Sequence, residues 1–214
     1  MDLTFKDTMG ALSVAIALFS YALYVWKTFR AHARPHPLSW LIFGVLSGTG
    51  FLIQLDQSAG AGSWVMGVTA AVCFMLCLIG FWQGERTFPW YEWAFLAAAA
   101  IVFAFYLWSQ QPAASAILAS VVNVLGFGPT LTKAWSRPHS DSTSTFMLNG
   151  LKFVPSLWAM DSVTIATCVL PASLVVTNLA VAAIIAARRK QTLPLVPAKA
   201  GTQRENSGFP LSRE

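Results

Sequence analysis

The sequence predicts an all-α, polytopic membrane protein with seven transmembrane helices. The chain has 214 residues, of which 56% are hydrophobic and only 11% are charged. Soluble domains carry about 25% charged residues. Several runs of about 20 residues contain almost no charge, and each is long enough to cross a bilayer. A soluble helical protein would have to bury all of these runs, so we expect them to lie in lipid.

The apolar runs and the polar segments between them place the seven helices. We expect them at residues 8–29, 38–56, 62–83, 90–108, 112–135, 144–161 and 163–187. No small-residue cleavage motif follows the first run, so we expect that run to be the first span and not a signal peptide. Tryptophans fall near the ends of the runs, which is typical of an aromatic belt at the membrane surfaces. They are Trp64, Trp82, Trp90, Trp93, Trp108, Trp135 and Trp158.

Basic residues are concentrated in alternate connections between the spans. They follow spans 1, 3, 5 and 7, and they are Lys27, Arg30, Arg34, Arg86, Lys133, Arg137, Arg188, Arg189 and Lys190. The other connections carry Lys6 together with Asp2, Asp7, Asp56 and Asp161. Because cytoplasmic loops are enriched in Lys and Arg, we expect the N-terminus outside and the C-terminus in the cytosol. Residues 191–214 lack apolar periodicity and are expected to form a disordered cytosolic tail.

An internal repeat organises the chain. Residues 27–40 and 133–146 are approximate copies of one helix–basic loop–helix pattern, 106 residues apart, and Gly44 and Gly150 continue the same register. The offset groups spans 1–3 (residues 1–84) and spans 5–7 (residues 111–190) as two three-helix repeats, with span 4 (residues 85–110) as a linker helix. Three crossings reverse the chain direction and the linker restores it, so we expect a parallel 3+1+3 repeat.

The segment 129–144 resembles the signature of the PQ-loop superfamily, which includes the SWEET sugar transporters and the bacterial SemiSWEETs (MtN3-type proteins). Pro129 stands at the signature proline, Lys133 and Arg137 stand at its basic positions, and Ser144 opens the next helix. Thr130 stands where the signature has glutamine. In the first repeat, Leu23 and Tyr24 replace the Pro-Gln pair. With the 3+1+3 layout and the outside N-terminus, the resemblance extends over about residues 8–187.

The resemblance implies a membrane transporter or facilitator of a small polar solute, either a sugar or an amino-acid-like molecule. Such proteins work by alternating access, in which one three-helix repeat rocks against the other. The alternative is a non-transporting membrane protein on the same scaffold, with an assembly, receptor or lipid-binding role.

Prolines inside the predicted helices are candidate hinges. A proline removes one backbone hydrogen bond and clashes with the carbonyl four residues before it. We expect Pro129, with Thr130 beside it, to act as a hinge near the cytosolic gate, and Pro155 to be able to kink span 6. The alternative for all of them is that proline is simply more frequent in membrane helices than in soluble ones.

Two polar residues of span 6 are candidate solute-binding residues. Asn149 and Lys152 are three residues apart and therefore share a helix face. Inserting a lysine at the centre of a membrane helix costs roughly 2.5–3.5 kcal/mol on insertion scales, so the presence of Lys152 requires an explanation. We expect Lys152 to be a cavity-lining cation paired with Glu92, or else part of a structural interhelical pair.

The resemblance implies a second pair of solute-binding residues, Trp158 on span 6 and Asn178 on span 7. An indole face stacks on a sugar ring and an amide bonds its hydroxyls. Trp158 is out of phase with Asn149 and Lys152, so both faces line one pocket only if Pro155 kinks the helix. The alternative for Trp158 is an interfacial anchor. The first repeat has Leu52 and Val72 at the matching positions, with Thr69 as the nearest polar candidate, whereas Gln54 and Asn123 are expected to bond neighbouring helices.

Catalytic and metal-binding motifs are missing from the sequence. It contains no H-E-x-x-H, no G-x-S-x-G and no P-loop, so we expect no enzyme activity, catalytic residue or cofactor. Cys73, Cys77 and Cys168 lie inside apolar runs and are expected to be buried thiols, not metal ligands.

The partners that we expect are a small-molecule solute and the lipid bilayer. Nucleic acid is excluded because the basic residues behind the net charge of +5 lie beside helix ends. One chain contains both halves of a pore, so we expect a monomer to suffice, with a homo-oligomer as the alternative. Short loops favour a bacterial inner (plasma) membrane.

Overall fold

The computed structural model describes residues 3–30, 36–83, 88–136, 138–139 and 142–191, and these residues form helices joined by turns. The predicted C-terminal tail lies outside the described residues, apart from the helical Gln191. The elements are α1 (Leu3–Phe29), α2 (Pro37–Asp56), the 3₁₀ turn η1 (Gly60–Ser63), α3 (Trp64–Gln83), α4 (Trp90–Ser109), α5 (Pro112–Gly126), α6 (Gly128–Ser136), α7 (Thr143–Leu151), α8 (Phe153–Trp158) and α9 (Ile165–Gln191).

Six helical segments within the described residues are long and apolar enough to cross a membrane. They are Phe5–Trp26, Pro37–Asp56, Gly60–Trp82, Trp90–Ser109, Pro112–Ser136 and Ile165–Gln191. An all-α membrane protein is therefore what the structure supports, as the composition predicted. The boundaries agree with the predicted spans to within a few residues, except that α1 begins five residues earlier than predicted and α9 ends four residues later.

Of the seven predicted spans, residues 144–161 are the one without a counterpart among these six segments. It consists of two short helices, α7 and α8, separated at Lys152, and α8 already ends at Trp158. Pro155 has no N–H, so it cannot bond the Leu151 carbonyl four residues earlier. The chain keeps its direction across the break, since Lys152 has helical dihedral angles and its N–H bonds the Leu148 carbonyl at 3.1 Å.

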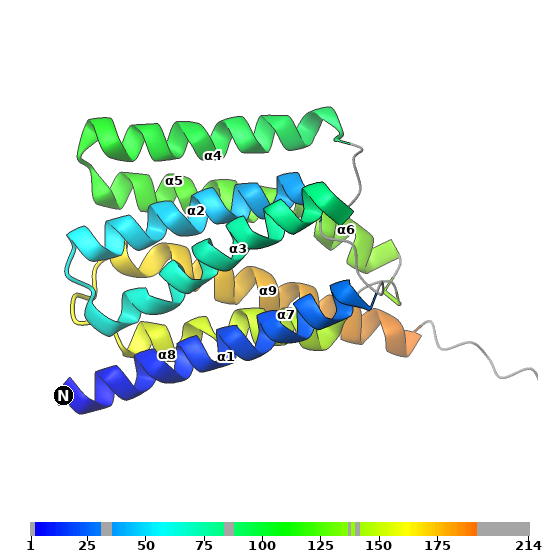
Figure 1. Cartoon of the computed structure of the whole chain (residues 1–214), viewed down its shortest axis with the longest axis horizontal. Coiled ribbons are helices and arrows are strands. Elements are labelled where there is room, and N and C mark those ends of the chain that lie inside the picture. The colour runs from blue at the N-terminus through cyan, green and yellow to red at the C-terminus, as the bar shows by residue number, and fades with distance from the viewer. Residues whose placement is uncertain (1–2, 31–35, 84–87, 137, 140–141, 192–214) are drawn as a thin grey trace, which may run out of the picture.

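Consecutive long helices run antiparallel along the bundle (Figure 1). The N-terminus lies at the same end as the α2–η1, α4–α5 and α8–α9 connections, and this end carries Lys6, Asp56 and Asp161. We call it the Asp161 end. The C-terminal ends of α1, α3 and α6 lie at the opposite end, with Arg30, Lys133 and the last turn of α9, which holds Arg188. We call this the Arg188 end. Arg34, Arg86 and Arg137 lie outside the described residues, and the predicted separation of charge is present in the remaining cations.

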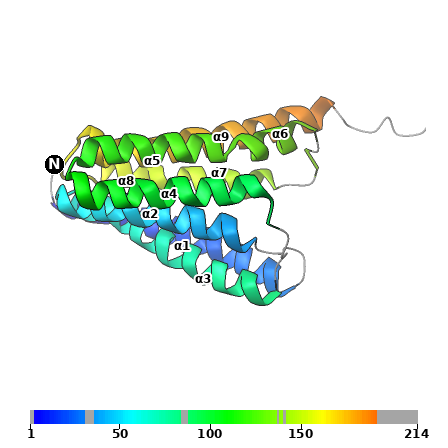
Figure 2. The ribbon, with the colours of Figure 1, turned by 90° about the horizontal axis from the view of Figure 1, so that it is seen from above.

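Helices pack in a similar order in the first and last parts of the chain. In the first unit (α1–α3), α3 contacts both α1 and α2; in the second unit (α5–α9), α9 contacts both α5 and α7. Across the units, α1 contacts α7 and α8, and α2 contacts α5. Helix α4 packs on α2 and α5 at the edge of the bundle (Figures 1 and 2). A shared core of buried side chains joins the units, and its members include Ala17, Leu46, Met66, Phe153 and Leu170.

The outer surface is apolar along its length and carries tryptophans near both ends. Trp64, Trp108 and Trp158 lie near the Asp161 end and are more than two-fifths exposed. Trp26, Trp82, Trp90, Trp93 and Trp135 lie near the Arg188 end and are more than half exposed. Between them, large aliphatic side chains such as Leu78, Ile101 and Val176 are also exposed. This distribution is what a lipid-embedded bundle with interfacial aromatic residues requires.

Polar side chains inside the bundle connect neighbouring helices. The Gln54 side-chain amide donates to the Thr167 carbonyl at 2.9 Å, and the Asn123 amide donates to the Ser173 hydroxyl at 3.4 Å. Both contacts link α9 to another helix, as the sequence predicted for these two residues. In an apolar surrounding, such bonds satisfy groups that would otherwise be costly to bury.

Candidate functional site

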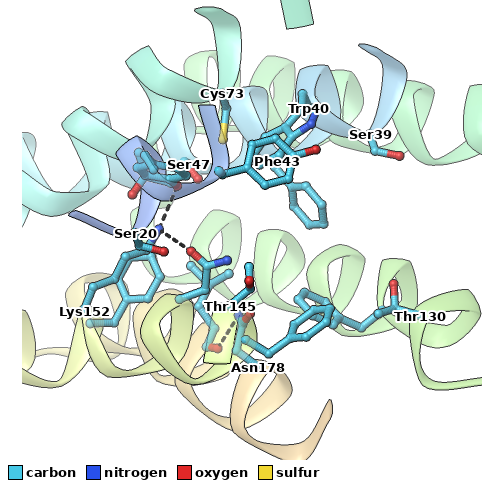
Figure 3. Close-up of a pocket in the computed structure, with 18 of the residues that line it drawn as sticks. Ser20, Ser39, Trp40, Phe43, Ser47, Cys73, Thr130, Thr145, Lys152 and Asn178 are labelled. Carbon is cyan, nitrogen blue, oxygen red and sulfur yellow. Dashed lines mark hydrogen bonds between the residues drawn. The ribbon is translucent and has the colours of Figure 1, made fainter. Parts of the chain in front are cut away.

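A cavity of about 590 Å³ lies between the first and second units. Figure 3 shows its lining as two facing groups, with Ser39, Trp40, Phe43 and Cys73 on one side and Thr130, Thr145 and Asn178 on the other. The described lining is Ser20, Tyr21, Tyr24, His36, Ser39, Trp40, Phe43, Ser47, Thr69, Cys73, Phe127, Thr130, Lys133, Thr145, Phe146, Asn149, Lys152, Phe153, Leu174 and Asn178.

Helical spacing explains why these side chains meet. On α2, Trp40 is followed by Phe43 three residues later, and Ser47 follows after four more, so they share one face. On α9, Leu174 and Asn178 are four apart and also share a face. Each of these two helices therefore contributes one stripe of side chains to the cavity, and each stripe contains both polar and apolar groups.

The cavity extends from the Arg188 end to about the middle of the bundle. His36 and Lys133, which lie at the ends of their helices, line the mouth, whereas Thr69 and Lys152 line the deep part. The mouth therefore contains a histidine and a lysine, and the deep part contains a buried lysine beside hydroxyl and amide groups.

Lys152 is buried, with only 2% of its surface exposed. Its ammonium donates to the Tyr21 hydroxyl at 2.7 Å and to the Asn149 side-chain oxygen at 3.4 Å (Figure 3). It also lies 4.2 Å from the centre of the Tyr21 ring and 4.9 Å from that of Phe153. The break between α7 and α8 falls at this residue. The Lys152 side chain therefore reaches from the second unit to the first at the point where the helix is interrupted.

The predicted pairing of Lys152 with Glu92 is wrong. Glu92 Oε2 instead lies 3.3 Å from the Nδ1 of His36. The reason is that α4 packs on the outside of α2 and none of its described residues lines the cavity, so the start of α4 does not reach the deep part. A second ion pair joins Lys6 to Asp161, and neither of these two pairs includes Lys152.

The predicted solute-binding residues Asn149 and Asn178 line the same cavity as Lys152. The Asn178 amide donates to the Leu174 carbonyl at 2.8 Å, one turn earlier in α9. An amide has two N–H donors and one oxygen acceptor, so Asn178 retains hydrogen-bonding capacity toward the cavity. The structure thus brings three of the four predicted residues together.

Trp158 does not join them. It lies at the end of α8 near the Asp161 end, it is 63% exposed, and it is not part of the cavity lining. The break at Lys152 therefore does not turn Trp158 toward Asn149 and Lys152, which was the condition for both faces to line one pocket. Its position fits the alternative of an interfacial anchor.

The predicted hinge residues lie shortly after two helix interruptions. Pro129 follows Gly128, the first residue of α6, and the preceding break at Phe127 separates α6 from α5. Thr130 lines the cavity near its mouth. Pro155 lies in α8, three residues after the break at Lys152. Movement at these two points stays a prediction.

The cavity residues that were missed from the sequence include Tyr21, Ser20 and Trp40. Tyr21 is the principal partner of Lys152 although 131 residues separate them. The available signal was the pair of hydroxyl residues Ser20 and Tyr21 in the middle of an apolar run, where lipid-facing polar groups are disfavoured.

Beyond the cavity, the two units are in close contact. The α2 backbone at Gly50 meets Met66 and Leu170, and a Cβ placed there would lie 2.5 and 2.6 Å from their side chains. At the Asp161 end, the Asp161 N–H donates to the Ala59 carbonyl at 3.0 Å, and the Lys6 ammonium bonds the Asp161 carboxylate at 2.7 Å. The units are therefore packed together at the Asp161 end and separated by the cavity toward the Arg188 end.

No protein-family description, curated protein or solved structure matches this chain. A function for this protein therefore has to be inferred from the geometry and chemistry of the cavity.

Proposed function

We propose that this protein is a membrane transporter or facilitator of a small polar solute, working by alternating access between α1–α3 and α5–α9. The observation that carries the proposal is the cavity between these two units, whose lining combines polar with aromatic side chains and which reaches one end of the bundle. A solute entering from the Arg188 end would reach Lys152, and release at the other side would require the units to separate there.

The repeated geometry of two glycines supports the division into like units. A Cβ at Gly44 of α2 would lie 3.4 Å from the Cβ of Cys73 on α3. A Cβ at Gly150 of α7 would lie 3.3 Å from the Cβ of Asn178 on α9. The two glycines are 106 residues apart, and their contact partners are 105 residues apart. We therefore propose the 3+1+3 arrangement, in which α4 links the units, and membership of a PQ-loop-like superfamily.

The distribution of charge supports an orientation. The described cations of the Arg188 end would face the cytosol and Lys6 with Asp161 would face outside, by the positive-inside rule. The cavity would then be open to the cytosol. A bacterial inner membrane is the proposed location.

Uptake into proteoliposomes tests the proposal. Purified protein is reconstituted and offered radiolabelled glucose, alanine and lactate, each with and without a pH gradient. We expect uptake of at least one solute above that of protein-free vesicles. If none of the three enters under either condition, the non-transporting alternative replaces the transporter.

A cross-link at the Asp161 end tests alternating access. In a background without the native cysteines, Lys6→Cys and Asp161→Cys are combined, because the two side chains already meet and are partly exposed. A short thiol-specific cross-linker should abolish uptake, and cleavage of the linker should restore it. The matched controls are the two single-cysteine variants, which should keep their uptake after treatment. Full uptake by the cross-linked protein would exclude movement at this contact.

A further inference from the structure

We propose that the deep part of the cavity binds the carboxylate of a small organic anion, with Lys152 as its charged partner. The proposal names a solute class for the transporter, and only the step of carrying the anion rests on the proposed function. It depends on three features of the described residues, namely a cation without a carboxylate, a hydroxyl without a partner, and a lining without acidic side chains.

The first feature is the charge of Lys152. A buried ammonium is costly unless an opposite charge or several hydrogen bonds compensate it. Lys152 has a hydroxyl, an amide oxygen and two aromatic rings around it, but its neighbours in the described residues include no carboxylate within ion-pair distance. An ammonium has three N–H donors, and two are used. The third donor and the positive charge are therefore available to an anion in the cavity.

The second feature is the hydroxyl of Thr69, which lines the same cavity and is buried. It lies beside the Tyr21 hydroxyl, but its oxygen makes no hydrogen bond of proper geometry within the described part of the chain. Gln54, Glu92 and Asn123 also have a buried side-chain atom without a hydrogen-bond partner, and Thr69 is the one of these four described residues that lines the cavity. Buried polar groups nearly always have partners, so a ligand toward which this covered hydroxyl turned would supply the missing one. A carboxylate has two oxygens, and Lys152 and Thr69 would each donate to the group.

The third feature selects among anions. Among the residues that the structure describes, the lining contains two lysines and one histidine and no aspartate or glutamate. The ammonium group of an amino acid would find no carboxylate among these residues, and a neutral sugar would leave Lys152 uncompensated. A carboxylate without an ammonium group fits both requirements. Its body would contact the aromatic side chains Trp40, Phe43 and Phe127.

The test compares carboxylates with their uncharged amides. Binding of lactate, lactamide, butyrate, butyramide, glucose and alanine to purified protein in lipid nanodiscs is measured by calorimetry and by the shift in melting temperature. We expect lactate and butyrate to bind at least about tenfold more tightly than the matching amides, because charge-assisted hydrogen bonds are roughly twice as strong as neutral ones. Amides, glucose or alanine binding as tightly as the carboxylates would overturn the proposal.

Variants locate the site. Lys152→Met removes the charge at similar length and should lose about tenfold or more in carboxylate affinity, whereas Lys152→Arg should retain part of it. Thr69→Val replaces the hydroxyl by a methyl group and should weaken carboxylates several-fold without affecting the charge. If Lys152→Met does not fold, the carboxylate affinity of Thr69→Val and the comparison of carboxylates with amides on the wild-type protein still test the site. Unchanged carboxylate affinity in a folded Lys152→Met variant, or in Thr69→Val, would refute the site.

Transport measurements distinguish a failure of the anion site from a failure of the proposed transporter function. Carboxylate binding without uptake of any solute into proteoliposomes would remove the transporter and leave the anion site. Uptake of glucose or alanine that Lys152→Met does not change, without carboxylate binding, would leave the transporter and remove the anion site.

Discussion

At the scale of single residues, Tyr21 decides where the Lys152 ammonium lies. The hydroxyl of Tyr21 accepts the shorter of the two hydrogen bonds from this lysine, and the tyrosine ring lies against the same ammonium. Tyr21 itself is only 6% exposed. The contact joins α1 to the α7–α8 break, so it holds the two units together next to the cavity as well as positioning the cation.

Tyr21→Phe removes this hydroxyl and keeps the ring. We expect the free energy of unfolding to fall by about 1.5–3 kcal/mol, the typical value for a hydrogen bond to a charged group. Thermal unfolding in detergent measures the change. The matched control is Tyr91→Phe on α4, where the ring is 39% exposed, and it should melt close to the wild type. Equal melting temperatures for both variants would show that Tyr21 does not hold the lysine.

At the scale of elements, close approach of helices at the Asp161 end depends on small residues. A Cβ at Gly62 in η1 would lie 2.5 Å from the Met160 Cγ and 2.8 Å from the backbone oxygen of Ser156. A Cβ at Gly10 in α1 would lie 2.7 Å from the Cβ of Ala61. Small residues let backbones pack closely in membranes, where the hydrophobic effect does not drive helices together.

Gly62→Ala should therefore disturb the contact between η1 and α8. Because backbone atoms would have to move, we expect a loss of about 1–3 kcal/mol, as for other overpacked sites. Gly126→Ala is the matched control at the end of α5, since a Cβ there would meet no atom within 4 Å. It should be neutral or stabilise by up to about 1 kcal/mol through helix propensity. Melting curves of both variants check the pair, and a Gly62→Ala protein as stable as Gly126→Ala would contradict the packing.

At the scale of the whole molecule, charge and hydrophobicity combine into one orientation. Described cations such as Arg188 and Arg189 lie at one end of the bundle, and the Lys6–Asp161 pair lies at the other. The Arg188 guanidinium bonds the Trp135 carbonyl at 3.2 Å and lies 4.6 Å from the centre of its ring. Arg188 is therefore held beside an exposed tryptophan, where headgroups of a bilayer would meet it.

Single cysteines test the orientation. In a background without native cysteines, Ser109→Cys at the end of α4 and Ser136→Cys at the end of α6 place one thiol at each end of the bundle. A membrane-impermeant maleimide applied to intact spheroplasts should label Ser109→Cys and leave Ser136→Cys unlabelled. Permeabilised cells are the control, in which both should react. The reverse pattern in intact cells would invert the proposed topology.

Part of the candidate site followed from helix periodicity. Asn149 and Lys152 share a face because they are three residues apart, and Asn178 was placed by resemblance; all three line the cavity. Trp158 was assigned to the same pocket from a motif alignment, but it is exposed near the Asp161 end. The sequence pattern shows which residues share a face of one helix. It does not show toward which neighbouring helix that face is turned.

The sequence by itself determined that this is a helical membrane protein, where its helices run, and that its cations gather at one end. Those properties depend on hydrophobicity and charge summed over about 20 consecutive residues, which is local information. Only the tertiary structure decided that Lys152 meets Tyr21, that Glu92 pairs with His36, and that the sixth predicted span is interrupted at the lysine. The two side-chain contacts join residues far apart in the chain, and they depend on how helices rotate and pack to satisfy buried polar groups.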